Sequence, residues 1–471
     1  MFERLKNRLR KVVRSMASNV LFQDKEVANA SYTTDVMTGA IQKWLSMYML
    51  SVHSDDDFKT LGLPAAIASE FARLVTLELE YKIVVPGNEE SENTRADYLS
   101  KQFEPFLKYI RRYTEYGCAC GGVMFKPYID GKNIAVDVCI ANDFYPLAFN
   151  SKGKITKCAF VEHKRVGNKY YHRIEKHEFT DSDYVVTNEA FVSYKQDTKG
   201  KPCSLTEVEE WSSLTEEQHI KNVKVPLFSY FAVPSGNCED PHSPLGVSVY
   251  SRAVPQINEA DRQWERYLWE YEGGELMVEA SREAFPIDKD GKPVVPSGKE
   301  RLFWITEFES KQENGTLTKF HSPAFRDASL KAGLNAILQR IEFNCGLAYG
   351  TFSDPQQIEK TAEEIKASKQ RSYSTVKDIQ KALKETLDDL VAAMNVYADL
   401  YKLSPSGKYE INDVWDDSII VDSETERARD LNEVRIGIMQ KWEYRVKWYG
   451  ESEETAKAAV AKEEKDDWHS V

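Results

Sequence analysis

Residues 345–387 read CGLAYGTFSDPQQIEKTAEEIKASKQRSYSTVKDIQKALKETL, and this stretch determines most of the predicted architecture. A glycine-bearing loop, Gly346–Asp354, comes first; Asp354 fits a helix N-cap and Pro355 fits the first helical position. The helix that follows is predicted to continue to about Tyr401. Its N-terminal half is mostly polar, whereas its C-terminal half has an apolar residue every three or four positions, which is typical of a buried face. This apolar stripe comprises Val376, Ile379, Leu383, Leu387, Leu390, Met394, Tyr397 and Tyr401. One helix is therefore expected to adjoin both a packed core and water or a cavity.

The segment before that loop is predicted to form two helices joined by a small β-rich insert. The first helix follows Gly246 and ends at Gly273-Gly274, and the return helix runs from about Ala328 to Cys345. Each helix carries a single apolar stripe, so each must bury it against another helix. Pro255 lies inside the first helix and indicates that its straight part begins near Gln256. The strand candidates of the insert, Gly273–Phe325, are Leu276–Glu279, Leu302–Phe308 and Thr316–Phe320.

The N-terminal half changes its hydrophobic period partway along. Residues 31–84 and 95–116 have helical spacing, with an interruption expected near Pro105. Short runs of β character follow, separated by turn signals such as Asp130-Gly131 and Gly167-Asn168. These runs are Val123–Ile129, Ile134–Ile140, Ile155–His163 and Tyr170–Phe179. An antiparallel sheet on a helical base, within an α+β fold, is the simplest arrangement.

The C-terminal segment, Lys402–Val471, is expected to be acidic and mostly helical. It holds 11 Lys+Arg and 17 Asp+Glu, a balance of −6 out of −13 for the whole chain. A strand is predicted at Ser418–Val421, followed by helices at Glu424–Trp442 and Glu451–Glu464. The negative charge of the chain is therefore unevenly distributed.

Length and composition limit the class of protein. The chain has 471 residues, 42% of them hydrophobic and 11% aromatic, which excludes wholesale disorder. This length suggests about three domains. A net charge of −13 argues against a protein whose entire surface binds nucleic acid, but not against a local contact. No apolar run reaches about 18 residues, so no transmembrane helix is expected.

The N-terminus is the most basic stretch of the chain. Its sequence, MFERLKNRLRKVVRSM, has an amphipathic helical pattern that includes Arg8, Arg10 and Lys11, and no apolar signal-peptide core follows it. Two interpretations stay open: a solvated terminus, or an anchor for nucleic acid or for an acidic neighbouring subunit. Seven scattered cysteines without a secretory signal indicate a reduced, intracellular protein.

No motif identifies an enzyme, and no cofactor or metal is predicted. The chain has no P-loop, no dinucleotide-binding glycine fingerprint, no G-x-S-x-G and no H-E-x-x-H. Three groups of residues have both a functional and an ordinary interpretation, and the ordinary one is favoured for each. A zinc site, or buried thiols in a sheet, is considered for Cys118, Cys120, Cys139, Cys158 and His163. Catalytic histidines, or a polar sheet face, are considered for His163, His172 and His177. A metal nuclease, or a solvated acidic edge, is considered for Asp413, Asp417 and Asp422.

In this order, the predicted segments resemble the portal proteins of tailed bacteriophages, in particular the portal, or minor capsid, family of long-tailed phages of Gram-positive bacteria. The resemblance covers most of residues 60–440 and lies in the ordered set of segments, since no single motif is as specific as a Walker sequence. Pro255, inside the first stem helix, is a departure from the family pattern. The segments that carry the resemblance are GLPAAIASEFARLVTLELEYKI (Gly62–Ile83), YGCACGGVMFKPYIDG (Tyr116–Gly131), ANDFYPLAFNSKGKI (Ala141–Ile155), SPLGVSVYSRAVPQINEADRQWERYLWEYEGGELMV (Ser243–Val278) and residues 345–387 as quoted above.

The resemblance implies a portal fold of wing, stem, clip and crown, assembled as a ring, typically of twelve copies, at one capsid vertex. It assigns the wing to residues 1–245, the stem to 246–272 and 326–345, the clip to 273–325, the tunnel loop and long wing helix to 346–401, and the crown to 402–471. It also implies a structural protein that conducts DNA during packaging and ejection and hydrolyses nothing itself.

The same resemblance implies the partners and the location. The partners are further copies of the chain, double-stranded DNA bound without sequence specificity, the large terminase, a head-completion adaptor, and the major capsid and scaffold proteins, with no membrane. The protein is expected in the virion, at the portal vertex, and in the host cytoplasm during assembly. Two alternatives stay open: another virion assembly protein, scaffold- or tail-associated, and a carbohydrate- or phosphodiester-active enzyme.

Three sets of residues are expected to act. Gly346 and Gly350 are hypothesised to let the tunnel loop move as DNA passes. The tunnel loop that would contact DNA comprises Gly346, Leu347, Ala348, Tyr349, Gly350, Thr351, Phe352, Ser353 and Asp354. Candidates for the channel-facing side of the long helix are Glu359, Lys360, Glu363 and Lys366, and candidates for packing between subunits in the stem are Ile257, Trp264, Tyr267, Leu334 and Ile341.

Overall fold

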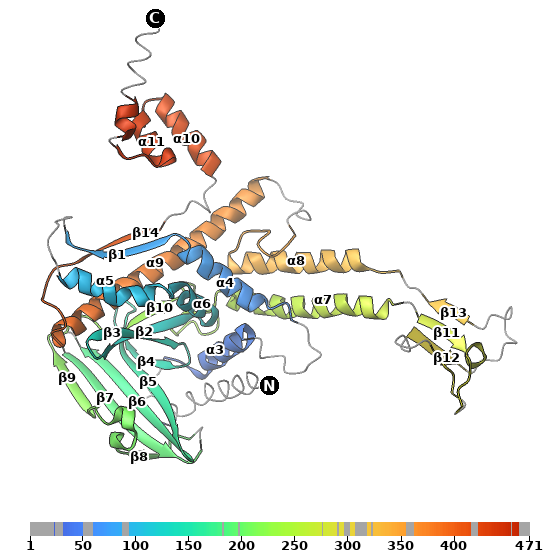
Figure 1. The fold of residues 1–471 in the computed structure, drawn as a ribbon, viewed down its shortest axis with the longest axis horizontal. Coiled ribbons are helices and arrows are strands. Elements are labelled where there is room, and N and C mark those ends of the chain that lie inside the picture. The colour runs from blue at the N-terminus through green and yellow to red at the C-terminus, as the bar shows by residue number, and fades with distance from the viewer. Residues whose placement is uncertain are drawn as a thin grey trace, which may run out of the picture. The chain divides into compact units, whose positions relative to one another are not determined.

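The computed structural model describes two compact units of the chain (Figure 1). The first unit comprises Met1–Leu77 and Lys82–Ile411, and the second comprises Glu78–Tyr81 and Asn412–Val471. The described residues are 23, 32–49, 60–86, 94–180, 183–195, 198–275, 277–289, 292–295, 302–306, 318–321, 324–354, 362–415, 423–453 and 455–460.

Helices at the N-terminal side of the first unit form the predicted base. They are α3 (Asp35–Tyr48), α4 (Leu63–Thr76), α5 (Thr94–Leu107) and α6 (Ile110–Cys120). Helix α4 starts after its N-cap residue Gly62, which has a positive φ of 68°. The helix buries Ile67 and Phe71 completely. Pro105 lies inside α5, and the interruption falls just beyond it, at residues 108–109. The helical prediction fails for residues 79–84, which form strand β1 (Leu79–Val84), because their burial alternates with a period of two.

The predicted antiparallel sheet is confirmed, but it is divided into two sheets. The first has the order β10-β2-β3 and the second the order β4-β5-β6-β7-β8, with β9 paired to β7. Strands β4 and β7–β10 were not among the predicted runs. The bounds are β2 Gly122–Asp130, β3 Asn133–Ile140, β4 Phe144–Phe149, β5 Ile155–Val166, β6 Lys169–Thr180, β7 Asp183–Ser193, β8 Lys201–Cys203, β9 Glu217–Lys221 and β10 Ser229–Ala232.

The main core of this region lies between the two sheets. Met124 of β2, Phe144 of β4, Cys158 of β5 and Tyr184 of β7 belong to one buried cluster. The side chains that cover it include Tyr397 of the long helix. Cys118 and Cys120 lie in the last turns of α6 rather than in a strand, contrary to the expectation from sequence.

At Gly246, where the first of the two long helices was expected to begin, the backbone instead approaches another segment closely. A Cβ atom at Gly246 would lie 2.1 Å from the carbonyl oxygen of Gly121, and Gly121 itself has a φ of +90°. Val247 is completely buried beside them. A short 3-10 helix (Ser251–Ala253) follows, and the helix α7 starts only at Val254 (Val254–Gly273), with Pro255 in its first turn, where proline is tolerated.

Helices α7 and α8 (Asp327–Cys345) lie side by side and lead to a small sheet (Figure 1). The sheet has the order β12-β11-β13, with bounds β11 Met277–Ser281, β12 Phe303–Thr306 and β13 Thr318–His321. Strand β11 is parallel to β12 and antiparallel to β13. All three strand predictions in the insert are confirmed in position, with shifts of one to two residues at most ends.

The long helix is α9, described over Ala362–Leu400. The predicted stripe from Val376 to Met394 is almost completely buried, whereas Tyr401 lies beyond the helix and is 47% exposed. Helix α9 is joined to α5 by Arg95, a fully buried arginine. Its guanidinium donates to Asp399 Oδ1 (2.5 Å), to Asn395 Oδ1 (3.1 Å) and to the carbonyl oxygens of Asn395, Ser404 and Pro405.

The second unit is small and helical. Its helices are α10 (Ser423–Arg435) and α11 (Lys441–Tyr449), and strand β14 (Glu410–Trp415) pairs with β1. The single helix predicted over Glu424–Trp442 is wrong, because Gly437 with a φ of +78° ends α10, and a capping box of Gln440 and Glu443 starts α11. The strand predicted at Ser418–Val421 lies outside the described residues.

Arg95 provides a test of how α9 is attached. We expect Arg95→Met to destabilise the first unit by about 3 kcal/mol, because five hydrogen bonds to its buried guanidinium are lost. Arg111→Met, at an exposed position of α6, is the matched control and should change the free energy of unfolding by less than about 0.5 kcal/mol. Urea unfolding of both variants measures the difference, and equal stabilities would contradict the role given to Arg95.

Candidate functional site

The α7–α8 pair buries its apolar stripe only at one end, where α7 begins and α8 ends. Ile257 of α7 and Ile341 of α8 are completely buried by the chain itself. Trp264, Tyr267 and Leu334, further along, are half-buried. Subunit packing stays a prediction for these residues, and the three half-buried side chains have the accessible surface it needs.

A row of aromatic rings follows α7 away from the buried end. Trp264 stacks on Tyr267 with ring centres 5.5 Å apart, Tyr267 meets Tyr271 edge-on at 5.1 Å, and Tyr271 lies 5.5 Å from Phe325. The hydroxyl groups of Tyr267 and Tyr271 are hydrogen-bonded at 2.8 Å. Tyr271 is 41% and Phe325 50% exposed, and nearby Trp269 is 64% exposed, so a large aromatic area stays open to solvent in the single chain.

An ion pair fixes the far end of the two helices. Glu270 of α7 is 8% exposed and accepts from Arg326 through its backbone N–H (3.0 Å), Nε (3.1 Å) and Nη2 (2.6 Å). These hydrogen bonds from Arg326 lower the pKa of Glu270 below its ordinary value. The start of α8 is thereby tied to the end of α7.

The predicted tunnel loop, Gly346–Asp354, is folded around one carboxylate. Glu342 of α8 is completely buried. Its Oε1 accepts from the backbone N–H groups of Phe352 (2.6 Å) and Ser353 (2.8 Å), and its Oε2 accepts from Gly350 N–H (3.3 Å) and the Ser353 hydroxyl (2.8 Å). Four donors from the loop thus solvate a single buried acid.

Further contacts hold both ends of the loop. Gly346, with a φ of +79°, ends α8, and the N–H of Leu347 donates back to the Glu342 carbonyl at 2.9 Å. The Leu347 side chain is completely buried. At the other end, Asn335 Oδ1 accepts from Asp354 N–H at 2.7 Å. The positive φ angles of Gly346 and Gly350 therefore serve one folded conformation of the loop.

Sequence reasoning did not identify Glu342 or Asn335 as functional candidates. The two residues are seven apart, so they lie on one face of α8, beside the apolar positions Leu334 and Ile341. Polar residues repeated at that spacing next to a buried stripe were the available signal. The channel-facing candidates are not tested: Glu359 and Lys360 lie outside the described residues, as do the side chains of Glu363 and Lys366 within α9.

The groups considered for catalysis have ordinary structural roles in the described parts of the first unit. Burial raises the pKa of the Cys118, Cys158 and Cys345 thiols. The expectation that the histidines lie on a polar sheet face is wrong for two of them, because both faces of this sheet are covered and His172 and His177 are buried. His177 is hydrogen-bonded to Glu175 and to the Tyr184 hydroxyl, so it is a satisfied core residue.

His163 and His172 face each other across β5 and β6. Their Nδ1 atoms are 2.6 Å apart, and burial lowers the pKa of each to about 4. Among the described residues, no three His, Cys, Asp or Glu side chains are arranged to hold a metal ion. Asp417 and Asp422 lie outside those residues. The described helices also include none that is long and apolar enough to cross a bilayer.

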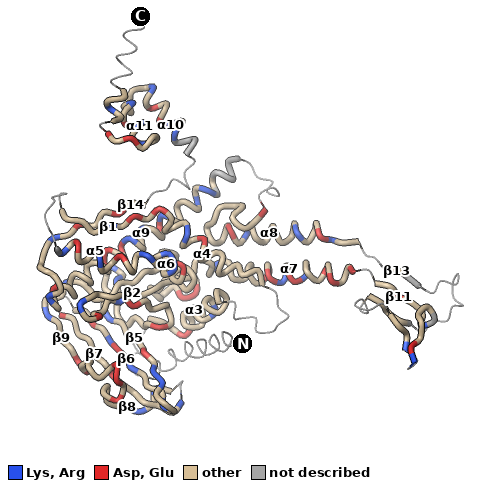
Figure 2. The backbone as a smooth tube through the Cα atoms, in the orientation of Figure 1, with Lys and Arg blue, Asp and Glu red and all other residues tan. Residues whose placement is uncertain are grey.

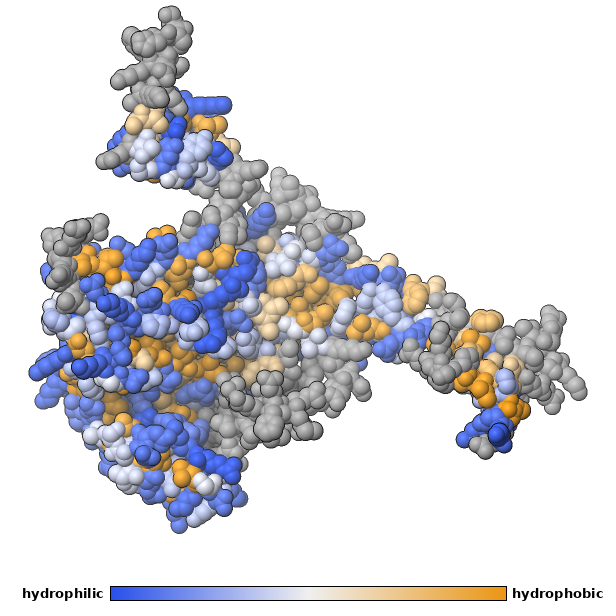
Figure 3. All heavy atoms as spheres, in the orientation of Figure 1, coloured by the Kyte–Doolittle hydropathy of each residue, from blue (hydrophilic) through white to orange (hydrophobic). Residues whose placement is uncertain are grey.

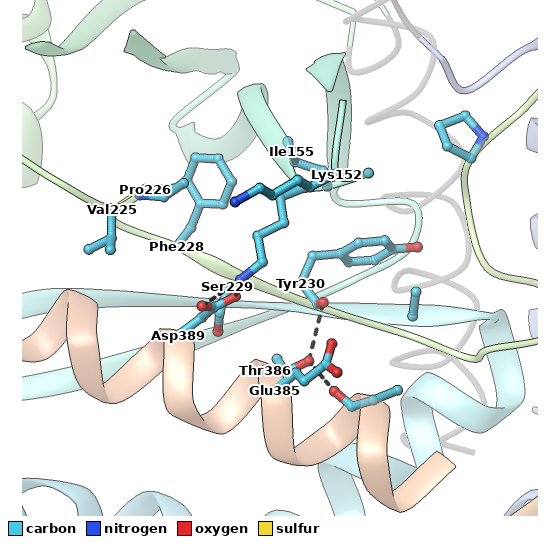
Figure 4. Close-up of a pocket in the computed structure, with 15 residues that line it drawn as sticks. Lys152, Ile155, Val225, Pro226, Phe228, Ser229, Tyr230, Glu385, Thr386 and Asp389 are labelled. Atoms are coloured by element: carbon cyan, nitrogen blue, oxygen red, sulfur yellow. Dashed lines mark hydrogen bonds and ion pairs between the residues drawn. The ribbon is translucent and has the colours of Figure 1, made fainter. Parts of the chain in front are cut away.

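A pocket of about 230 Å³ lies between the β4–β5 turn, β10 and α9 (Figure 4). Lys154 extends from the turn to Asp389 of α9, with an Nζ–Oδ1 distance of 2.7 Å, and Thr386 donates to the Tyr230 carbonyl at 3.3 Å. The lining of this pocket combines lysines, acids and apolar side chains, and no group in that lining is activated for catalysis. The buried Glu342 and its loop are the more specific feature of the unit.

Removing the Glu342 carboxylate should release the loop. For Glu342→Ala we expect amide exchange at Gly350, Phe352 and Ser353 to rise about 100-fold, because hydrogen bonds to a buried charge are worth about 3 kcal/mol together. Glu342→Gln keeps one carbonyl oxygen and should give an intermediate rate. Hydrogen exchange with mass spectrometry checks both, and Glu265→Ala on the exposed face of α7 is the control. Unchanged exchange in Glu342→Ala would refute the role of this carboxylate.

The Glu270–Arg326 pair predicts a pH dependence. Because the pKa of Glu270 is lowered in the folded state, its contribution to stability is fully present above the unfolded-state pKa of about 4.3 and is lost as the pH falls through the folded-state value. Wild type should therefore be more stable than Glu270→Gln at pH 7, and the difference should decrease as the pH is lowered below about 4.3. Thermal unfolding over a series of pH values from 7 to 3 measures this, and a difference that does not decrease in acid would show another origin.

Comparison with known proteins identifies the family of this chain. No curated protein matches the sequence. A chain of a solved structure titled "Neck of empty GTA particle computed with C6 symmetry" is similar with a TM-score of 0.40 and 12% identity over 86% of this chain and 92% of that one, which is too distant to support an argument. The family described as "Phage portal protein, SPP1 Gp6-like" matches residues 73–467. Its match extends over the sheets, the α7–α8 pair, the Glu342 loop and α9, and the chain belongs to this family of phage portal proteins, which act at the capsid vertex.

Proposed function

We propose that this portal protein assembles into a closed ring, typically of twelve copies, whose axial channel conducts double-stranded DNA. The observation that carries the ring is the stem: α7 and α8 cover each other's apolar faces near the unit but leave aromatic side chains half-exposed further along. Symmetric neighbours would bury this surface, because each copy presents the same face. The wing, stem, clip, crown and tunnel-loop assignments carry over, with the first stem helix beginning at Val254.

The loop Gly346–Asp354 is proposed to line the channel. Its fixed conformation around Glu342 supports this role, since a rim of identical, rigid loops would keep the bore constant as DNA passes. Basic and acidic residues are interspersed along α7 and α8 (Figure 2), which suits weak contact with a moving polyanion better than a dense cationic surface. Movement of the DNA is driven by a partner motor, the large terminase, in this proposal.

The small β11–β13 sheet is proposed to be the docking platform for the terminase and for the head-completion adaptor. Trp304 of β12 is 62% exposed and Phe320 of β13 is 69% exposed, and both strands are edges of the sheet. Hydrophobic surface is visible over this region in Figure 3. Exposed aromatic side chains next to unpaired strand edges are typical of protein–protein contact sites.

Mass photometry with negative-stain imaging tests the ring. The purified protein should form closed rings with an axial opening, at a mass that is a multiple of 54.0 kDa. Trp269→Glu places a charge on the exposed aromatic surface of α7 and should reduce ring formation strongly without affecting the fold of the single chain. Tyr194→Glu, at a residue that is 76% exposed near the end of β7, is the control and should leave rings intact. A wild-type chain that stays monomeric at every salt concentration would contradict the proposal.

A further inference from the structure

Two arginines converge on one aromatic ring where α8 meets α9. The Phe343 side chain, in the last turn of α8, is 41% exposed. The guanidinium carbon of Arg340, one turn earlier, lies 5.7 Å from the centre of this ring, and that of Arg371, on α9, lies 4.2 Å from it. Both distances are within the roughly 6 Å over which a cation and an aromatic ring attract each other. The two cations are thus held on one ring, directly before the loop that begins at Gly346.

Neither guanidinium has an acidic partner within the described chain. The buried acid closest in sequence, Glu342, accepts its hydrogen bonds from the loop instead. The Nη1 atom of Arg371 is inaccessible to solvent and has no hydrogen-bond partner among the described residues. An external partner cannot reach that buried atom, so the donors it can use are the other N–H groups of half-buried Arg371 and those of exposed Arg340.

The surroundings favour a wide, smooth, anionic partner. Ala332 and Ala336 are exposed and precede Arg340 by eight and four residues, so they lie along the same face of α8. The exposed ring of Phe343 on this face lies beneath the two guanidinium groups, so the surface it offers is mainly cationic. Two guanidinium groups, each with several donors in a fixed plane, match phosphate oxygens in geometry and charge.

We propose that Arg340 and Arg371, supported by Phe343, form a binding site for the phosphodiester groups of a double-stranded polynucleotide. The proposal rests on the conduit function proposed above and adds the side chains that touch the DNA backbone. Because this site contributes two cations from each subunit, its contacts around the ring would be separate and individually weak. Phosphate contacts carry no sequence information, so the site acts on any DNA that passes.

A photoreactive side chain locates the contact directly. In the full-length protein, p-benzoylphenylalanine placed at position 343 should cross-link to a 30-base-pair DNA duplex on irradiation of assembled rings. The same probe at position 128, where Tyr128 is 46% exposed on β2, is the control and should give little or no DNA adduct. Cross-links from position 343 only to a second copy of the chain, or none to DNA, would overturn the proposal.

Salt dependence measures the number of phosphate contacts. The slope of the logarithm of DNA affinity against the logarithm of salt concentration should become shallower by at least about 1 in the double variant Arg340→Gln/Arg371→Gln, since each lost phosphate contact changes it by about 0.9. Arg262→Gln/Arg266→Gln removes the same charge from α7, where both arginines are paired with Glu259, and should leave the slope nearly unchanged.

Ring formation distinguishes failure of the phosphate site from failure of the conduit function. Mass photometry of Arg340→Gln/Arg371→Gln should show rings like those of wild type. Intact rings with an unchanged salt slope would overturn the phosphate site while leaving the conduit function standing. Loss of rings in this variant, but not in Arg262→Gln/Arg266→Gln, would show that the arginines bind a carboxylate of a neighbouring copy and would likewise overturn it. A wild type without rings would instead count against the conduit function.

Discussion

The buried carboxylate of Glu342 is the constraint on which the centre of the structure depends. A charge removed from water needs donors, and no lysine or arginine within the described residues pairs with this one. The loop after α8 supplies them from its own backbone and from Ser353, which forces the chain to turn back over the helix that it has just left. Since Leu347 and Asp354 are also fixed, the chain leaves the loop in a defined place on its way to α9. The helix pair, the loop and the long helix therefore form one connected arrangement.

A second constraint comes from the unequal burial of the α7–α8 pair. Near the sheets, Ile257 and Ile341 are enclosed by the chain, whereas the aromatic row from Trp264 onward is only partly covered. Two helices cannot enclose a full stripe without a third partner. The Glu270–Arg326 pair holds the far ends together without adding any apolar cover, so the helices remain paired while their aromatic surface stays available.

Much of the fold could be predicted from periodicity, and the failures have local physical causes. The stripe of α9, the return helix α8 and four strands of the N-terminal half follow directly from spacing. Gly246 was placed in a helix because its approach to Gly121 is a tertiary contact that no local pattern records. Strand β10 is only four residues long, and α10 ends at Arg435, two residues before the positive φ of Gly437, which spacing alone does not indicate. At the site, the loop was predictable from its glycines and the resemblance, but the dependence on Glu342 was not, because a glutamate in a helix ordinarily lies in water.

The fixed conformation of the Glu342 loop bears on how DNA would pass through a ring of this portal protein. Glycines suggest a loop that yields, yet displacing this one would expose or orphan four donors and a buried charge together, so small displacements are resisted cooperatively. In the proposed ring, a rigid rim of these loops would still let a polyanion slide if each contact is weak and the contacts are repeated evenly around the bore. The net charge of −13 is consistent with this, because an acidic chain holds DNA only where its cations are concentrated. In that proposal, low friction comes from weak and separate contacts with DNA rather than from flexibility of the loop.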